Sequence, residues 1–447
     1  MKKNNNLTQG SALKVLVTFA LPFLFANFMQ AFYGAADLFV VGQFSGTSSI
    51  SAVNIGSQIM QIITSFVIGI SMGTTVTLGQ NIGSKKFDEA AKTVGNTIII
   101  FVFFAILITP IMIWQSGTLA DLMQTPVEAL QETKQYVIIC SSGLPFIVAY
   151  NVISAVLRGM GDSKTPMYFV GIACIVNVLG DLLLTGIFGM GVIGAAIATT
   201  SAQCVSSICG IIYLVKKGLG FPFSKYSLKC YKGVLKRILF IGIPIAMQDT
   251  LINISFMLLT VIANERGVVA SSAVGVVEKL ILFMFLVPSS MLSSISAITA
   301  QNIGAGKKER AILSLKYGII ITVAFGIIMC TFSQIFPNLM TRIFAKDMNV
   351  VIEASEYLRT YSIDCILVGV TFCINGYLCG IGKSIITFFH NTISIFLVRI
   401  PTAFILSRMF KDSLLPMGLA SPIGSIASII ILCIYWLWQK KHIKTDV

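Results

Sequence analysis

The sequence predicts an all-α integral membrane protein with twelve transmembrane helices arranged as two pseudo-symmetric six-helix bundles. Hydrophobic residues make up 55% of the 447 residues and charged residues only 11%, about half of what a soluble protein carries. Apolar stretches of about 20 residues, the length that crosses a bilayer as a helix, recur along the chain. The segment Gly79-Gln80-Asn81-Ile82-Gly83 returns as Ala300-Gln301-Asn302-Ile303-Gly304, which indicates an internal duplication.

The apolar stretches define twelve predicted spans in chain order. They lie near residues 14–40, 50–78, 93–114, 135–157, 166–187, 190–215, 235–262, 270–298, 315–336, 355–378, 385–407 and 416–438. Segments rich in Gly, Ser or Lys separate them, as at 42–49, 83–86 and 304–310. The first stretch is longer than the apolar region of a cleaved signal peptide, so we expect it to remain as the first transmembrane helix.

Basic residues are distributed unequally between the predicted loops. With the N-terminus inside, 23 Lys and Arg fall in cytoplasmic segments and seven fall on the opposite side. The positive-inside rule then predicts that both termini are cytoplasmic. The cytoplasmic set includes the terminal residues Lys2, Lys3, Lys440, Lys441 and Lys444. We interpret the net charge of +14 as an orientation signal within a lipid bilayer and expect no nucleic-acid partner.

The repeated segment belongs to a duplication that extends over both halves. With the same spacing of 221 positions, Gly46 recurs as Gly267, Tyr136 as Tyr357, and Gly159-Met160-Gly161 as Gly380-Ile381-Gly382. Since each half has an even number of spans, the repeats are parallel and related by an axis along the membrane normal. We predict a bundle at 1–215, a cytoplasmic linker at 216–234 and a bundle at 235–447. In duplicated transporters the substrate site lies between the repeats.

Five acidic residues fall inside the predicted spans, where an unpaired carboxylate is costly and therefore suggests function. They are Asp37, Asp181, Asp249, Glu278 and Asp364. The two halves do not share these acids, because Leu258 and Thr402 stand at the positions that correspond to Asp37 and Asp181. The halves therefore have a common scaffold with different chemistry.

The acids of the first half are candidates for a cation site. Asp37 lies in span one, and Asn177 and Asp181 lie one helical turn apart in span five, so their side chains face the same way. Thr199 in span six could add a hydroxyl. These oxygen ligands suit a small cation such as Na⁺. Two carboxylates in one dry pocket cannot both stay ionised, so the pair could equally hold a proton. The alternative is that each acid is structural and hydrogen-bonded to a neighbouring helix.

A proline, the acids of the second half and several uncharged polar and aromatic residues have less specific interpretations. Pro22, with Pro244 as its counterpart, weakens span one and is either a hinge or a packing bend. Asp249, Glu278 and Asp364 are expected to form a separate cluster with Arg399 or Lys279, most simply a structural salt bridge. The two Gln-Asn pairs are expected to cap helices and bind inner loops. Residues that could line a substrate cavity are Asn27, Gln30, Phe32, Tyr33 and Gln58.

Several site types are not expected. The ten cysteines lack CxxC spacing and most lie in apolar runs, where cysteine acts as a small hydrophobe. The two histidines, His390 and His442, are far apart in sequence, so a histidine-based metal site is not expected. No GxxxxGK[ST] segment is present, which argues against ATP-driven pumping. Apart from a coupling H⁺ or Na⁺, we expect no cofactor and no enzymatic activity.

The pattern resembles the multidrug and toxic compound extrusion (MATE) family over nearly the whole chain. The resemblance rests on the two six-span halves, the paired Gln-Asn-Ile-Gly segments, and Arg158-Gly159-Met160-Gly161-Asp162 after span four. It implies a cation-coupled exporter of drugs or metabolites that alternates between outward- and inward-open forms. One prokaryotic branch has its cation site in the N-terminal half and a bending proline in span one. Those positions correspond to Asp37, Asn177, Asp181, Thr199 and Pro22 here.

A second, sodium-linked branch has essential acids in spans seven and ten. Asp249 and Asp364 lie in those spans but out of register with that motif, so the role is not carried over to them.

The resulting hypothesis is an H⁺- or Na⁺-coupled antiporter that exports amphipathic, often cationic molecules and acts as a monomer in the inner membrane of a prokaryote. One alternative is a flippase for lipids or lipid-linked oligosaccharides of the same fold superfamily. Another is a channel or scaffold. Ionisable groups that differ between the two halves favour coupled transport.

Overall fold

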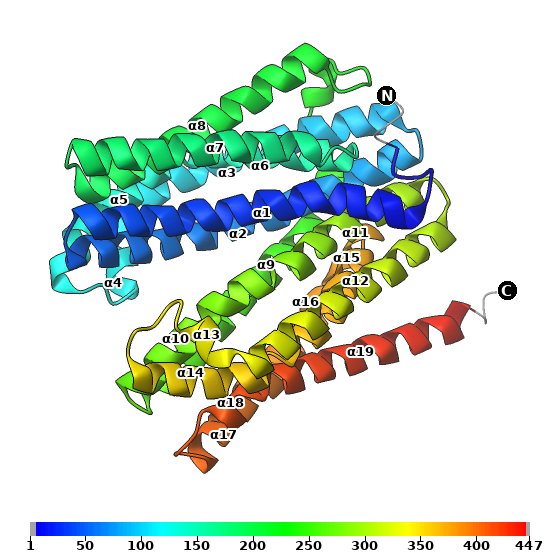
Figure 1. The fold of residues 1–447 in the computed structure, drawn as a ribbon. Coiled ribbons are helices and arrows are strands. Elements are labelled where there is room, and N and C mark those ends of the chain that lie inside the picture. The colour runs from blue at the N-terminus through cyan, green and yellow to red at the C-terminus, as the bar shows by residue number, and fades with distance from the viewer. Residues whose placement is uncertain (1–5, 444–447) are drawn as a thin grey trace. The chain divides into compact units, whose positions relative to one another are not determined.

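The computed structural model describes residues 6–443, with side chains to residue 439, and all regular secondary structure in that range is helical (Figure 1). Lys2, Lys3 and Lys444 lie outside the described residues, as do the side chains of Lys440 and Lys441. The chain divides into two compact units. Unit 1 comprises Met1–Ala246 with Ala300–Lys307, and unit 2 comprises Met247–Thr299 with Lys308–Val447. The repeat-based division at 216–234 stays a prediction.

Unit 1 contains the long helices of the first half. Its elements are α1 (Ala12–Phe44), α2 (Thr47–Gly83), α3 (Phe87–Trp114), α4 (Ser116–Leu122), α5 (Val127–Ser142), α6 (Leu144–Gly159), α7 (Lys164–Asp181), the π-helical η2 (Leu182–Ile187), α8 (Gly191–Lys217) and the 3₁₀ turn η3 (Lys225–Leu228). The first part of α9 (Lys232–Asn264) and the last turn of α11 (Leu286–Gly304) also belong to it.

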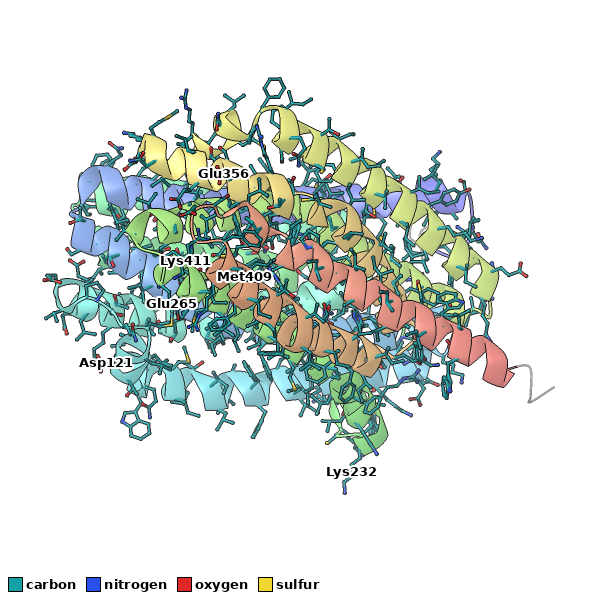
Figure 2. The ribbon with its side chains drawn as sticks, turned by 90° about the horizontal axis from the view of Figure 1, so that it is seen from below. Asp121, Lys232, Glu265, Glu356, Met409 and Lys411 are labelled. Carbon is teal, nitrogen blue, oxygen red and sulfur yellow. The ribbon has the colours of Figure 1, made fainter. Side chains whose placement is uncertain are left out.

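Unit 2 contains the remaining parts of α9 and α11 and the helices that follow. These are α10 (Val268–Met284), α12 (Lys308–Ile335), α13 (Pro337–Thr341), α14 (Met348–Tyr361), α15 (Asp364–Gly380), α16 (Ser384–Ile393), the π-helical η4 (Ser394–Arg399), α17 (Ile400–Met409), α18 (Leu415–Gly418) and α19 (Ala420–Ile443). Arg266 after α9 donates to the carbonyls of Lys411 and Ser413, so two loops are joined. Figure 2 labels Glu265 and Lys411, which mark these two loops.

Nine helices of the described part are long and apolar enough to cross a membrane. Three further helix pairs, α5–α6, α10–α11 and α14–α15, pass the same test together, with bends of 48°, 41° and 48°. If each bent pair is one span, the total is twelve. The predicted fold class, an all-α membrane protein, is confirmed with nine to twelve candidate spans.

The duplication recurs in backbone geometry. After α2 the amide of Lys86 donates to the carbonyl of Asn81 (2.9 Å), and after α11 the amide of Lys307 donates to the carbonyl of Asn302 (2.8 Å). The turns that end α6 and α15 also match, with Gly161 at φ +89° and Gly382 at φ +84°. Only glycine adopts such angles without strain, so the repeated glycines mark the same turn in both halves.

The two Gln-Asn-Ile-Gly segments pack against each other inside unit 1. A Cβ on Gly83 would lie 2.0 Å from the carbonyl oxygen of Gln301, and one on Gly304 would lie 2.1 Å from that of Gln80. Both glycines are therefore required for the close backbone approach. The side chain of Gln301 donates to the carbonyl of Gly159 (2.9 Å). This contact holds the end of α6 against the repeated segment.

Candidate functional site

The first-half acids lie where α1, α7 and α8 pack together within unit 1. The packing is close because Gly180 on α7 faces Ala198 on α8, and a Cβ on Gly180 would lie 2.9 Å from that of Ala198. The neighbouring residues Asp181 and Thr199 are thereby turned toward the same space. Asp37 is 4% exposed and Asp181 is fully buried.

The structure brings the four predicted residues together. Thr199 Oγ1 donates to Asp37 Oδ2 at 3.1 Å, and Asn177 Nδ2 donates to Thr199 Oγ1 at 3.3 Å. The carboxyl groups of Asp37 and Asp181 lie within hydrogen-bonding reach of each other. Three helices therefore contribute to a single polar cluster, which we call the acid pair site: Asp37, Asn177, Asp181 and Thr199.

Four oxygen atoms of the acid pair site have no hydrogen-bond donor in the described part of the chain. They are Asp37 Oδ1, Asn177 Oδ1, Asp181 Oδ1 and Asp181 Oδ2. The ion pairs of that part lie elsewhere, so no Lys or Arg neutralises either acid. Buried carboxylates without a partner are strongly disfavoured. These oxygens fit a small hard cation, and a proton shared by the two acids would satisfy them equally well.

Local helix geometry sets the position of Asp181. It is the last α-helical residue of α7, and the chain continues directly into the π-helical segment η2. There Phe188 donates its amide to the carbonyl of Leu183 (2.9 Å), five residues earlier. The added residue per turn changes which side chains face α1 and α8, and such π segments frequently occur at functional sites.

Pro22 is buried within α1, which is a continuous helix from Ala12 to Phe44. Because proline has no amide hydrogen, the carbonyl of Thr18 lacks its usual helical donor. This leaves one weakened turn about four turns before Asp37 on the same helix. The hinge role of Pro22 stays a prediction.

One polar contact beside the acid pair site was missed from the sequence. Gln203 Nε2 donates to the hydroxyl of Tyr33 at 3.4 Å. Tyr33 precedes Asp37 by one helical turn and Gln203 follows Thr199 by one turn, so the contact extends the cluster along α1 and α8. The four-residue spacing from Thr199 to Gln203 was the available signal, since it is the spacing that links Asn177 to Asp181.

The predicted cavity residues do not lie in either of two cavities described in unit 1. Phe32 is 55% exposed, Gln58 is also exposed, and Asn27, Gln30 and Tyr33 are half-buried. One cavity, of about 1000 Å³, is an apolar groove between α3, α6 and α8. The other, of about 920 Å³, lies near the N-terminus of α1 and has walls of both apolar and polar residues, including three lysines; we call it the polar cavity. The role of these five residues in binding substrate stays a prediction.

The polar cluster predicted for the second half is only partly assembled. Arg399 is buried and donates to the hydroxyl of Tyr361 (2.7 Å), while its guanidinium lies 4.9 Å from the ring centre of Phe256. Its charge acts on Glu278 and Asp364, but none of the ion pairs in the described residues includes it.

The salt bridge expected for this cluster is therefore not formed. No hydrogen bond or ion pair in the described range links Asp249 to the other members, and Lys279 is exposed. Glu278 instead accepts a hydrogen bond from Thr260 (3.1 Å). The buried arginine is held by an aromatic ring and a hydroxyl rather than by direct contact with an acid.

Comparisons with known proteins agree with the duplicated architecture. The family model MatE matches residues 22–183 and 244–405, two segments that begin 222 positions apart. The probable multidrug resistance protein YpnP of Bacillus subtilis is 26% identical over 99% of this chain and all of its own length. The probable multidrug resistance protein NorM of Thermotoga maritima is also 26% identical, over 97% of this chain and 94% of its own.

Solved structures show the same fold. The outward-facing conformation of a multidrug resistance MATE family transporter of the MOP superfamily has a TM-score of 0.92 at 21% identity, covering 100% of this chain and 99% of its own. A crystal structure of MATE in the bent conformation has a TM-score of 0.90 at 21% identity, covering 100% and 98%. The two family matches together span most of the chain, which therefore belongs to the MatE family of multi-pass membrane transporters.

Proposed function

We propose that this chain exports amphipathic drugs or metabolites by antiport with a proton or a sodium ion, which binds at the acid pair site. The observation that carries the proposal is the set of buried carboxyl oxygens of Asp37 and Asp181 that have no donor and no basic partner within the described residues. Burying these oxygens without a partner costs several kcal/mol. A cation that enters from water removes this cost. Its binding therefore changes the relative stability of the outward- and inward-facing conformations.

The proposed cycle uses α1 as the moving element. Binding of the cation removes the repulsion between Asp37 and Asp181, and α1 then bends at the weakened turn before Pro22. Bending changes the surface that α1 presents to the substrate, which is released outside. The protein then turns inward and releases the cation. Alternating access of this kind needs a ligand with different affinity for the two states.

One coupling ion is energetically sufficient. A single charge that moves with the membrane potential provides about 2.3 kcal/mol per 100 mV. At about 1.4 kcal/mol per tenfold change in concentration, this sustains roughly a 50-fold gradient of a neutral solute. A second coupled ion is not required at this potential.

The substrate class rests on relatives. YpnP and the Thermotoga NorM are both described as probable multidrug resistance proteins and align along almost their whole length. We propose amphipathic, often cationic substrates on this basis. We also propose that both termini lie in the cytoplasm, on the basis of the charge asymmetry of the loops, and that the protein acts as a monomer in a prokaryotic cell, the setting of its bacterial relatives.

The test is ion-driven transport in proteoliposomes with a cationic dye. A pH gradient alone and a sodium gradient alone are each applied to the wild-type protein, and the gradient that drives dye accumulation identifies the ion. Asp37→Asn is expected to abolish the ion-driven component while dye binding in detergent is kept. Full ion-driven accumulation in Asp37→Asn would remove Asp37 from the coupling mechanism.

A further inference from the structure

The polar cavity of unit 1 lies at one end of the bundle, where three parts of the chain meet. Its walls come from residues 6–19 at the start of α1, from 157–165 between α6 and α7, and from 213–220 at the end of α8. Its volume is about 920 Å³. The positive-inside distribution predicts that this end faces the cytoplasm. The acid pair site is not part of it.

The cavity carries a net positive charge. Its charged residues are Lys14, Lys164 and Lys217, with Asp162 as the one acid. Asp162 is already satisfied: it accepts from the amide of Thr165 (3.0 Å) and forms an ion pair with Lys217 (3.5 Å). The ammonium groups of Lys14 and Lys164 are exposed and have no hydrogen bond or ion pair within the described residues.

The start of α1 adds to the positive charge of the cavity. The cavity contains Ser11, the residue before α1, which makes no side-chain cap. The N-terminus of a helix carries a partial positive charge, and the α1 end keeps this charge, whereas Asp162 offsets it at the start of α7. The α1 end, together with two unpaired lysines, selects an anion with several acceptor oxygens.

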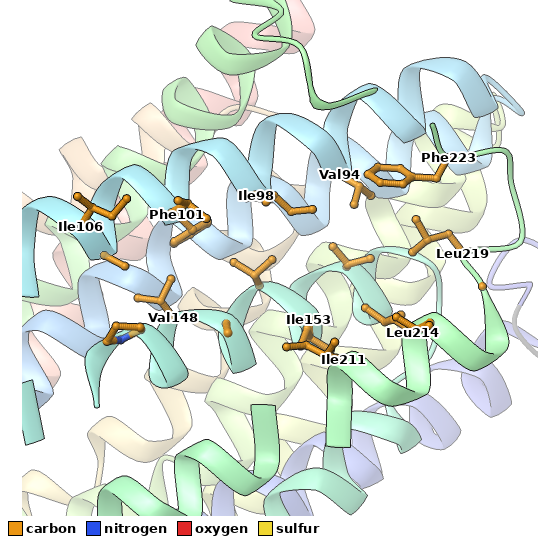
Figure 3. Close-up of a pocket in the computed structure, with 18 of the residues that line it drawn as sticks. Val94, Ile98, Phe101, Ile106, Val148, Ile153, Ile211, Leu214, Leu219 and Phe223 are labelled. Atoms are coloured by element: carbon orange, nitrogen blue, oxygen red, sulfur yellow. The ribbon is translucent and has the colours of Figure 1, made fainter. Parts of the chain in front are cut away.

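The apolar groove adjoins the polar cavity. The two share Gly218 and Leu219, where the chain turns at the end of α8 with Gly218 at φ +71°. The groove has apolar walls along nearly its whole length, with Phe223 and Leu219 near one end and Ile106 toward the other (Figure 3). On α3 it extends from Val94 to Pro110, about 24 Å of helix. This is most of the ~30 Å hydrocarbon core of a bilayer.

We propose that unit 1 binds an anionic glycerophospholipid of the cytoplasmic leaflet, with its phosphate between Lys14 and Lys164 and one acyl chain in the groove between α3, α6 and α8. A free phosphate compound would match the cavity but not the groove, and a neutral lipid would match the groove but not the lysines. An anionic lipid matches both the lysines of the polar cavity and the apolar groove. Basic pockets at the cytoplasmic ends of transmembrane helices bind such headgroups.

The test measures lipid binding to the purified full-length chain by native mass spectrometry. Phosphatidylglycerol is expected to bind more tightly than phosphatidylcholine with the same acyl chains. Lys14→Gln/Lys164→Gln is expected to weaken phosphatidylglycerol binding roughly 25-fold, since each basic group near an anionic headgroup contributes about fivefold. Phosphatidylcholine carries the same phosphate, but its quaternary ammonium group offsets the charge, so its binding should weaken much less. Lys86→Gln/Lys232→Gln removes the same charge outside both cavities and should have little effect.

A second variant tests the position of the lipid acyl chain separately. Ala149→Phe fills the groove and is expected to weaken binding of long-chain phosphatidylglycerol but not of a short-chain analogue. Ala324→Phe, on an exposed position of α12, is the matched control. Thermal melting in detergent verifies that each variant is folded.

Three results would overturn the proposal. The headgroup site is wrong if the double lysine variant binds phosphatidylglycerol as tightly as the wild type. The lipid assignment is wrong if soluble glycerol phosphate competes with phosphatidylglycerol at similar concentrations, because the ligand is then a soluble anion. The proposed position of the acyl chain in the groove is wrong if Ala149→Phe leaves the binding of long-chain phosphatidylglycerol unchanged. Ion-driven dye transport is measured in parallel, so loss of lipid binding is distinguished from loss of coupling.

Discussion

The two units use the same scaffold to hold buried charge in opposite ways. In unit 1, Asp37 and Asp181 face each other with no basic residue among the described partners. In unit 2, buried Arg399 lies among Tyr361, Phe256 and two more distant acids. The first arrangement lacks a positive charge that a mobile ion can supply, whereas the second contains its own. A duplicated fold therefore fixes the backbone while its polar positions diverge.

Removal of the internal cation of unit 2 should have the largest effect on stability. Arg399→Met removes the buried hydrogen bond to Tyr361 and the positive charge that acts on Glu278 and Asp364, and is expected to lower the free energy of unfolding by about 2–3 kcal/mol. Denaturation in detergent measures this. Arg408→Met is the control, because Arg408 forms an exposed ion pair with Glu265 (3.7 Å) and should cost less than ~1 kcal/mol. Equal effects would show that Arg399 is not an internal counter-ion.

The acids of the two units should differ in transport. In Asp181→Asn, ion-driven accumulation at 100 mV is expected to fall from roughly 50-fold toward unity, because the coupling ion no longer binds. Asp364→Asn should keep a gradient close to that of the wild type. Both are measured in proteoliposomes with matched amounts of protein. If Asp364→Asn also abolished accumulation, the coupling site could not be confined to unit 1.

The close packing beside the acid pair site can be tested through two glycines. Gly180→Ala adds a methyl group 2.9 Å from Ala198 and should destabilise the protein by about 1–3 kcal/mol through overpacking, with weaker coupling. Gly34→Ala, on α1, meets no atom within 4 Å. That change should be neutral or stabilise the helix by up to ~1 kcal/mol. Thermal denaturation should give opposite signs, and the same sign for both would contradict the packing argument.

The smallest expected effect is a difference in stability between two glycine substitutions, one in each copy of a contact that the duplication repeats. A Cβ on Gly380 would lie 2.7 Å from the carbonyl of Ser296, whereas one on Gly159 would lie 3.1 Å from the carbonyl of Thr75. These pairs correspond across the duplication. Gly380→Ala should therefore cost about 1 kcal/mol more than Gly159→Ala in the free energy of unfolding. Equal costs would mean that the two contacts relax alike.

Much of the fold follows from the sequence because the bilayer imposes a simple rule. Every backbone polar group in hydrocarbon must be satisfied within its own segment, so long apolar runs become helices. The 221-residue spacing identified the repeat, and the matched turns at Gly161 and Gly382 have the same geometry. Helix breaks were less predictable. The bends between α5 and α6, and in the two similar pairs, depend on packing of short segments rather than on apolar length.

Residue types and spacing alone made Asp37, Asn177, Asp181 and Thr199 candidates, since acids within apolar spans are costly. Only the tertiary structure decided that these side chains meet, because the meeting depends on the close approach of α7 to α8 at Gly180. It also decided that Arg399 binds Tyr361 rather than an acid, and that three lysines far apart in sequence share one cavity. Hydropathy is a property of single segments. Distances between side chains on different helices depend on how those segments pack, which no single segment encodes.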